Sequence, residues 1–157
     1  MNTPHRVLVT GSAGFLGSHI CHHFARRGAE VTAVSRRPRA VPRSIEQPRI
    51  VPVLLDLPHP DLEEVIRAVE PDLVVHCAGT ASVAHSVRAP YDDFSRGVDV
   101  CAATLDAVRR AHRRTKFVLL SSAAVYGSPD TLPIAESAPI SPISPYGFHK
   151  RMVELLV

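Results

Sequence analysis

The sequence predicts an α/β fold in which a doubly wound parallel sheet carries helices on both faces, giving three layers. Short continuous apolar runs alternate with helical patterns, as expected for parallel strands that are buried on both faces. Right-handed crossovers between such units give the strand order 3-2-1-4-5. The expected strands are 6–10, 30–34, 50–54, 73–76 and 116–121, and the expected helices are 15–27, 61–69, 91–112 and 145–157.

Each element has its own signal. Arg6–Thr10 is an apolar run that ends at a glycine-rich turn, and a helical stretch then leads to the second strand, Glu30–Val34. Residues 38–49 are rich in proline and arginine, so we expect a surface loop before the third strand. Residues 127–145 contain five prolines and predict an ordered loop beside the site. Pro145 suits the first turn of the last helix.

The composition predicts one globular domain over residues 1–157. Apolar residues make up 45% and charged residues 21%, values of a soluble protein large enough to bury a core. No apolar stretch nears the roughly 20 residues of a membrane span, and no signal peptide precedes the first strand, so we expect a cytoplasmic protein.

The net charge of +3 is modest, and its arginines occur in clusters without aromatic residues between them, which argues against nucleic-acid binding. These arginines are Arg26, Arg27, Arg36, Arg37, Arg39, Arg109, Arg110, Arg113 and Arg114.

The cysteines and histidines predict neither disulfides nor a metal site. Cys21, Cys77 and Cys101 are odd in number, far apart and set in apolar contexts, which favours buried thiols in a reducing compartment. Three histidines share the first helix, at positions 19, 22 and 23, and no carboxylate or cysteine joins them as a ligand set, so solvated side chains are favoured over ligands.

A glycine-rich turn follows the first strand. Gly11, Gly14 and Gly17 lie between an apolar strand and a helix, with Phe15 and Leu16 before the last glycine. Unpaired N–H groups and the dipole at such a helix start attract a pyrophosphate, and glycine lets it approach the backbone. The context predicts a dinucleotide site, the alternative being a purely structural turn.

Tyr146 and Lys150 form a Tyr-x-x-x-Lys pair near the start of the last expected helix. Four residues apart on a helix, the two side chains lie on one face. A cation at that distance stabilises a tyrosinate, so the tyrosine can act as a general acid or base on a hydroxyl or keto group. The alternative is a surface pair without function.

Together these blocks resemble the extended short-chain dehydrogenase/reductase family, in particular its nucleotide-sugar epimerases and reductases. The glycine spacing GxxGxxG, the block Leu119–Gly127 and the segment His76–Gly79 match its motifs in the right order. The resemblance implies a Rossmann-like domain, with Ser122 bonding the reacting oxygen and Tyr146 and Lys150 catalytic and in contact with the cofactor. Ser121 is expected to be structural.

The resemblance also implies further cofactor contacts. Asp56 and Leu57, after the third strand, resemble the residues beside the adenine, although a loop or cap role is nearly as well supported. Ala78 and Gly79, after the fourth strand, resemble small residues that let the backbone pack against the cofactor.

Two departures refine the family reading. The dehydratase branch has an Asp-Glu pair directly after the reactive hydroxyl residue, whereas this chain has Ala123 and Ala124, which transfer no proton. Dehydration is therefore disfavoured, and epimerisation or keto reduction remains. Gly97 stands where the family usually has asparagine, so a side-chain amide is missing. A glycine inside a helix also lowers the stability of the helix by about 1 kcal/mol relative to alanine.

The residues at the end of the second strand bear on the choice between NAD and NADP. An acidic residue there pairs with the ribose hydroxyls of NAD, but this chain has Ser35, Arg36 and Arg37. A guanidinium suits a 2′-phosphate, so NADP is mildly favoured over NAD. Solvated loop arginines are the alternative.

The resemblance covers nearly the whole chain, but the family continues into a smaller carboxy-terminal substrate domain. We therefore expect a truncated part of an NAD(P)-dependent epimerase or ketoreductase that acts on a nucleotide-activated sugar, with little turnover alone. The alternative is a non-catalytic dinucleotide-binding or interaction module. Related proteins pair two helices across a homodimer. The matching helices here, 91–112 and 145–157, include the apolar residues Val100, Leu105, Met152, Leu155 and Leu156.

Overall fold

The structure is a computed structural model that describes residues 4–37, 49–111 and 114–157. Most of the expected 38–49 loop, Arg39 and the 112–113 end of one expected helix therefore lie outside the described residues. The chain divides into two compact units. The first comprises residues 1–78 and 103–120, and the second comprises 79–102 and 121–157.

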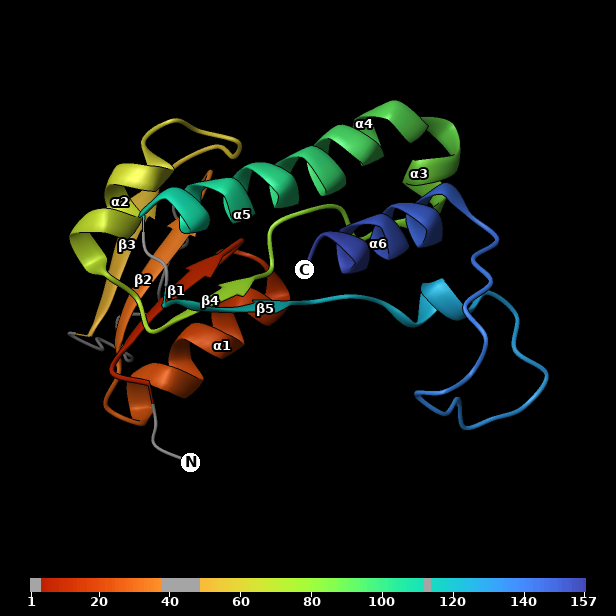
Figure 1. Ribbon diagram of the computed structural model, residues 1–157, viewed down its shortest axis with the longest axis horizontal. Helices are drawn as coiled ribbons and strands as arrows, with labels where there is room; N and C mark the ends of the chain where they lie inside the picture. Colours follow the sequence, from red (N-terminus) through yellow and green to blue (C-terminus); the bar gives the residue numbers. More distant parts are fainter. Residues whose placement is uncertain (1–3, 38–48, 112–113) are drawn as a thin grey trace. The chain divides into compact units, whose positions relative to one another are not determined.

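The first unit is built on a five-stranded parallel sheet of order β3-β2-β1-β4-β5, which confirms the predicted fold class and topology (Figure 1). The expected strand positions are confirmed, although β2 is one residue longer and β5 two residues shorter than predicted. The strands are β1 (Arg6–Thr10), β2 (Glu30–Ser35), β3 (Ile50–Leu54), β4 (Leu73–His76) and β5 (Lys116–Leu119).

Helices cover both faces of this sheet (Figure 1). On one face, α1 (Phe15–Arg26) buries Cys21 and Ala25 against β1, β2 and β4. On the other face lie α2 (Leu62–Val69) and the second part of α5 (Val100–Ala111). Continuous burial of Val7, Leu8 and Val9 follows from this double cover, because alternate strand side chains enter the two apolar layers.

The second unit is helical. It contains α3 (Val83–Arg88), α4 (Pro90–Phe94), a π-helix (Ser95–Asp99), a 3₁₀ turn (Ala123–Tyr126) and α6 (Pro145–Leu156). The start of α6 packs against α3 and α4, and Ser144 caps it by accepting the Gly147 N–H at 3.1 Å. Pro145 occupies the first turn, as predicted, because its missing N–H costs nothing there.

Two parts of this unit differ from the sequence prediction. The single helix expected over 91–112 is instead α4, the π-helix and α5 in succession. Gly97 lies in the wider π-turn, where its low helix propensity weakens the regular ladder. Helix α3 is not predicted by the sequence pattern, because six residues are too short to show a helical period; its signal is Ser82, which accepts the His85 N–H at 3.1 Å.

Candidate active site

The glycine turn of the first unit has the geometry that a close backbone approach requires. Gly11 has φ of +64°, and a Cβ there would lie 2.6 Å from the Ala78 nitrogen at the end of β4. Gly17 is buried in the first turns of α1, and a Cβ there would lie 2.3 Å from the Gly11 carbonyl oxygen. Only glycine fits these two positions without moving the turn.

The part of the same turn that leads into α1 is exposed to solvent. Gly14 is the exposed N-cap of α1, and the side chains of Phe15 and Leu16 are 78% and 56% exposed. A twelve-residue helix whose first turn carries no acidic side chain offers its N–H groups and positive dipole end to an anion. Such a helix start is the kind of backbone site at which a pyrophosphate can bind.

The end of β2 places two arginines in solvent. Arg36 and Arg37 are exposed, and the Ser35 hydroxyl donates to the Arg37 carbonyl at 2.9 Å. This hydrogen bond closes a tight turn directly after the strand. The two arginines are therefore exposed at the end of β2.

The remaining predicted cofactor residues lie at strand ends. Asp56 is exposed after β3, and Leu57 packs against the core beneath α2 and α5. After β4, the Ala78 N–H donates to Thr10 Oγ1 at 3.3 Å, and that oxygen lies 2.9 Å from Nδ1 of the buried His76. These contacts hold the β4 end close to the glycine turn. Gly79 follows with φ of +137° and belongs to the second unit.

The three predicted catalytic residues belong to the second unit. Tyr146 and Lys150 lie on one face of α6, with the Lys150 Nζ 5.8 Å from the centre of the Tyr146 ring, which confirms their predicted juxtaposition. Ser122 begins the 3₁₀ turn, and its Oγ accepts the Ala124 N–H at 3.2 Å. That bond does not use the hydroxyl proton, so Ser122 retains a donor for another oxygen.

The 3₁₀ turn and the start of α6 are in close contact. A Cβ at Gly147 would lie 2.6 Å from the Ala124 carbonyl oxygen, so the backbone approach needs glycine. The Ser121 hydroxyl donates to the Glu154 carboxylate of α6, in agreement with the structural role expected for Ser121. These contacts bring the Ser122 segment to the helix that carries Tyr146 and Lys150.

Sequence reasoning missed the residues that hold α6 from its other side. The Tyr146 N–H donates to Oγ of the fully buried Ser86 at 3.0 Å, and His149 bonds Asp93. Ser86 and Asp93 lie about 60 residues before their partners, which no local pattern reveals. The one sequence feature that could have pointed to the Asp93 contact is His149, which lies directly beside the predicted catalytic Lys150.

Electrostatics in this unit come mainly from local pairs. Hydrogen bonds from Arg96 and from His85 hold the pKa of Asp92 below its usual range. Burial raises the pKa of the Cys101 thiol, and the Lys150 ammonium opposes that shift. Cys101 is therefore a thiol in the folded chain rather than a nucleophile.

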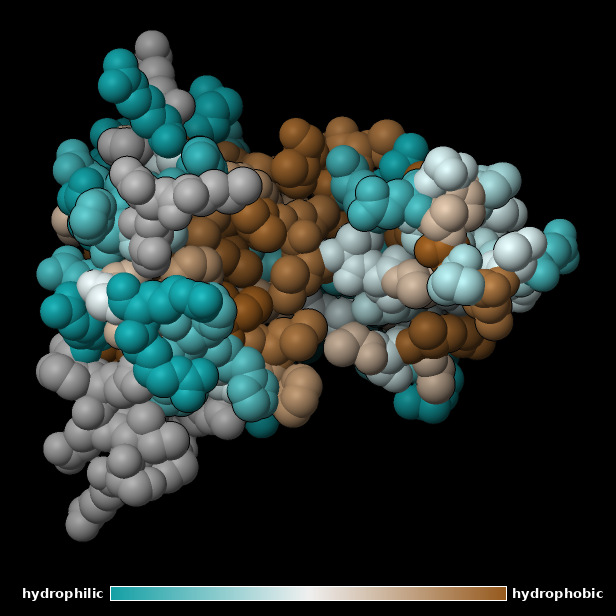
Figure 2. Space-filling view, turned by 90° about the horizontal axis from the view of Figure 1, so that it is seen from below, coloured by the Kyte–Doolittle hydropathy of each residue, from teal (hydrophilic) through white to brown (hydrophobic). Residues whose placement is uncertain are grey.

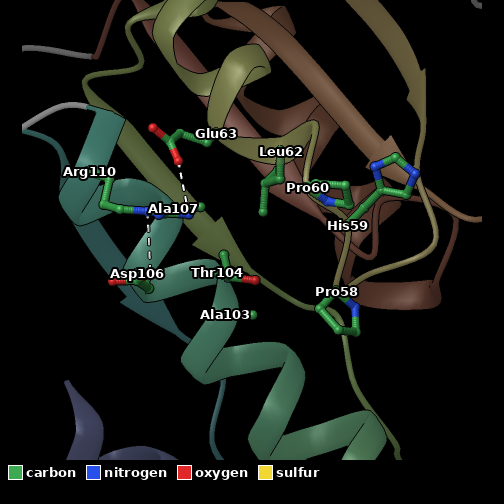
Figure 3. A pocket seen from close by; sticks show the side chains of 10 residues that line it. All are labelled: Pro58, His59, Pro60, Leu62, Glu63, Ala103, Thr104, Asp106, Ala107 and Arg110. Atoms are coloured by element: carbon green, nitrogen blue, oxygen red, sulfur yellow. Dashed lines mark ion pairs between the residues drawn. The ribbon is translucent and has the colours of Figure 1, made fainter.

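A separate pocket of about 260 Å³ lies in the first unit between α2 and α5 (Figure 3). Its charged residues pair with one another: Arg110 reaches both Glu63 at 3.0 Å and Asp106 at 3.3 Å. None of the predicted site residues lines it. Across the described residues, no group of three or more His, Cys, Asp or Glu side chains is arranged to hold a metal ion.

The comparison with known proteins agrees with these motifs. Residues 7–157 match the family model described as the NAD dependent epimerase/dehydratase family. The chain belongs to this family. A UDP-glucose 4-epimerase of Azospirillum brasilense is 39% identical over 154 residues, which cover 97% of this chain and 43% of that relative. A putative UDP-glucose 4-epimerase of Methanocaldococcus jannaschii is 35% identical over 94% of this chain and 48% of its own length.

Solved structures of epimerases share the fold of this chain as well as part of its sequence. The UDP-glucose 4-epimerase of Brucella ovis, in complex with NAD, superposes with a TM-score of 0.87 at 32% identity, covering 97% of this chain and 46% of that one. The enzyme of Stenotrophomonas maltophila, with bound NAD and formylated UDP-arabinopyranose, gives 0.86 at 32% identity, covering 97% and 47%. The chain thus spans about half the length of the relatives that it matches. No helix in the described ranges is long and apolar enough to cross a membrane.

Proposed function

We propose that this chain carries the cofactor-binding and proton-transfer residues of an NAD(P)-dependent epimerase or ketoreductase that acts on a nucleotide-activated sugar. The observation that carries the proposal is the placement of Tyr146 and Lys150 on one face of α6, with the ammonium 5.8 Å from the ring centre. Ser122, on a turn that packs against the same helix, supplies a hydroxyl donor.

Each of these side chains has a role that its chemistry allows. Tyr146 takes the proton of the reacting sugar hydroxyl and returns it, acting as general base and then as general acid. The Lys150 ammonium lies over the Tyr146 ring on the same face of α6 and places a positive charge beside the reacting groups. Ser122 donates a hydrogen bond to the sugar oxygen and orients it. Ala123 and Ala124 carry no acid, so elimination of water is not part of the proposal.

Gly11, Gly14 and Gly17 would form the turn that holds the pyrophosphate of the cofactor, and a Cβ at Gly11 or Gly17 would collide with backbone atoms and displace that turn. Asp56 and Leu57 would contact the adenine, and the backbone at Ala78 and Gly79 would line the cofactor. Phe15 and Leu16 flank the pyrophosphate turn. The bound nicotinamide would supply hydride transfer.

The exposed Arg36 and Arg37 support NADP, whereas the solved relatives named above were determined with NAD. We propose that the chain accepts both dinucleotides, with NADP bound more tightly. Of substrates, UDP-glucose is the first to test, because the relatives carry that name.

We also propose a cytoplasmic homodimer. Apolar side chains reach the surface of the protein (Figure 2), and α6 exposes Phe148, Met152, Leu155 and Leu156. Val100, in contrast, is only 5% exposed, so it does not contribute the contact that its sequence position predicts.

The second candidate function is a non-catalytic dinucleotide-binding module, which the glycine turn supports without the Tyr146 set. The roles proposed for the glycine turn and for the Tyr146 set do not include orientation of the sugar ring. Rate depends on that orientation, which is worth roughly 7–11 kcal/mol.

Calorimetry and a turnover assay separate these outcomes. We expect the chain to bind NAD or NADP, and we expect Gly14→Val, which adds a branched side chain at the exposed N-cap, to weaken binding while the protein stays folded. Product formation from UDP-glucose, abolished in Tyr146→Phe, would establish the enzyme. Binding without turnover would favour the module, and unchanged affinity in folded Gly14→Val would refute the dinucleotide site.

A further inference from the structure

A buried histidine–aspartate hydrogen bond joins α6 to α4 beside the Tyr146 and Lys150 pair. His149 Nδ1–H donates to Asp93 Oδ2 at 2.6 Å, and the two side chains are 15% and 0% exposed. The other carboxylate oxygen, Asp93 Oδ1, is buried without a hydrogen-bond partner among the described residues. The Phe94 ring meets the imidazole edge-on, with 5.5 Å between ring centres. The imidazole is thus held in one orientation.

Stability alone does not explain this pair. Removing a carboxylate from water is costly, and here one of its oxygens is not compensated. Apolar residues of similar volume are often at least as stabilising as a buried ion pair, whereas a directional pair can select one packing arrangement over its neighbours. The geometry therefore points to orientation as the contribution of Asp93 and His149.

The helical repeat shows what the pair orients. At about 100° per residue, His149 projects about 60° to one side of Tyr146, while Lys150 projects about 40° to the other side. Glu154 lies about 80° around on the Lys150 side, where it accepts the Ser121 hydroxyl. The face that carries Tyr146 and Lys150 is therefore bracketed by one anchor on each flank.

Small rotations of α6 would matter. A roll of about 10° moves a side-chain group about 5–6 Å from the helix axis by about 1 Å. A misplacement of that size can lower a reaction rate by about a hundredfold. Side-chain anchors on both flanks restrict such a roll, in addition to the bond from the Tyr146 N–H to Ser86 at the start of the helix.

We propose that Asp93 and His149 are positioning residues, which fix the roll of α6 and thereby the direction in which Tyr146 and Lys150 project. The proposal rests on the proposed function, because Tyr146 and Lys150 are its reactive pair. Neither Asp93 nor His149 needs to touch cofactor or substrate in this role.

The test compares two ligands by calorimetry on the full chain. Under the proposed function, the nicotinamide end of the dinucleotide is the part that Tyr146 and Lys150 would contact, whereas ADP-ribose, or its 2′-phosphate, lacks the nicotinamide. Removing the pair with His149→Leu or Asp93→Leu should weaken dinucleotide binding about tenfold and leave ADP-ribose binding within about twofold. His149→Asn, whose amide nitrogen replaces Nδ1, should restore dinucleotide binding.

A second His–Asp pair in the same unit provides the matched control. His85 bonds Asp92 at 2.8 Å, but these side chains are 38% and 40% exposed and lie on α3 and α4 rather than α6. His85→Leu should change neither affinity. Thermal unfolding checks that each variant is folded, and Asp93→Leu takes the place of a His149→Leu protein that does not fold.

Amide hydrogen exchange gives a readout that needs no ligand. The Tyr146 N–H, bonded to Ser86 Oγ, should exchange about tenfold faster in His149→Leu than in wild type, and His149→Asn should restore it. Wild-type chain that binds neither ligand refutes the proposed function, and the exchange result still decides the positioning role. Equal loss of both affinities, or unchanged Tyr146 exchange in folded His149→Leu, would overturn the positioning role itself.

Discussion

Gly17→Ala probes the close backbone approach on which the dinucleotide turn depends. The added Cβ would lie 2.3 Å from the Gly11 carbonyl oxygen and 2.9 Å from its carbonyl carbon. Both neighbours are backbone atoms of a residue that is itself held at φ of +64°. They cannot rotate away as a side chain would, so either α1 or the turn must move by about 1 Å to reach an ordinary contact distance.

The size of the effect follows from two opposing contributions. Overpacking of this kind costs about 1–3 kcal/mol, and rigid neighbours place Gly17→Ala at the upper end. Alanine recovers up to about 1 kcal/mol of helix propensity. The free energy of unfolding should therefore fall by about 2 kcal/mol, which corresponds to a Tm lower by about 4–8 °C in a domain of this size.

Gly97→Ala is the matched control. It is also a helical glycine, but its nearest neighbour to an added Cβ is Thr80 Oγ1 at 3.9 Å. Here the propensity gain of up to about 1 kcal/mol should raise the Tm by about 2–4 °C. Both variants are compared by thermal and urea unfolding, with dinucleotide affinity measured alongside. Gly17→Ala as stable as wild type, or Gly97→Ala markedly less stable, would refute the reasoning.

Three further outcomes are expected. The Asp72 carboxylate accepts the Arg6 and His5 N–H groups, which hold its pKa below the usual value. Its stabilising effect is therefore complete above about pH 4 and is lost as the pH falls through the folded pKa. Urea unfolding from pH 2 to 7 should show a smaller loss of stability in acid for Asp72→Asn than for wild type. Arg36→Ala should lower the NADP-to-NAD affinity ratio in calorimetry, and a ratio that stays constant would contradict the phosphate role. Sedimentation at high concentration should detect a dimer that dissociates in Leu155→Glu, and a monomer throughout would contradict the α6 contact.

Much of the fold could be predicted from local sequence patterns. The strands were recognisable because burial on both faces makes them continuously apolar, and the handedness of crossovers then limits the strand order. The start of α6 was recognisable because Pro145 and the Tyr146–Lys150 spacing are short-range features. Helix α3 and the π-turn at Gly97 were not, since six residues show no period and a one-residue widening leaves the apolar pattern nearly unchanged.

The sequence by itself determined the chemistry present: a glycine turn after a buried strand, a tyrosine one helical turn from a lysine, and a serine after the last strand. Tertiary structure alone decided which groups hold that chemistry in place. Ser86 reaches Tyr146 across 60 residues, and Asp93 reaches His149 across 56. Such contacts depend on how helices pack rather than on local spacing. The sequence therefore does not show which aspartates are buried and which are solvated, because burial is decided by the folded structure.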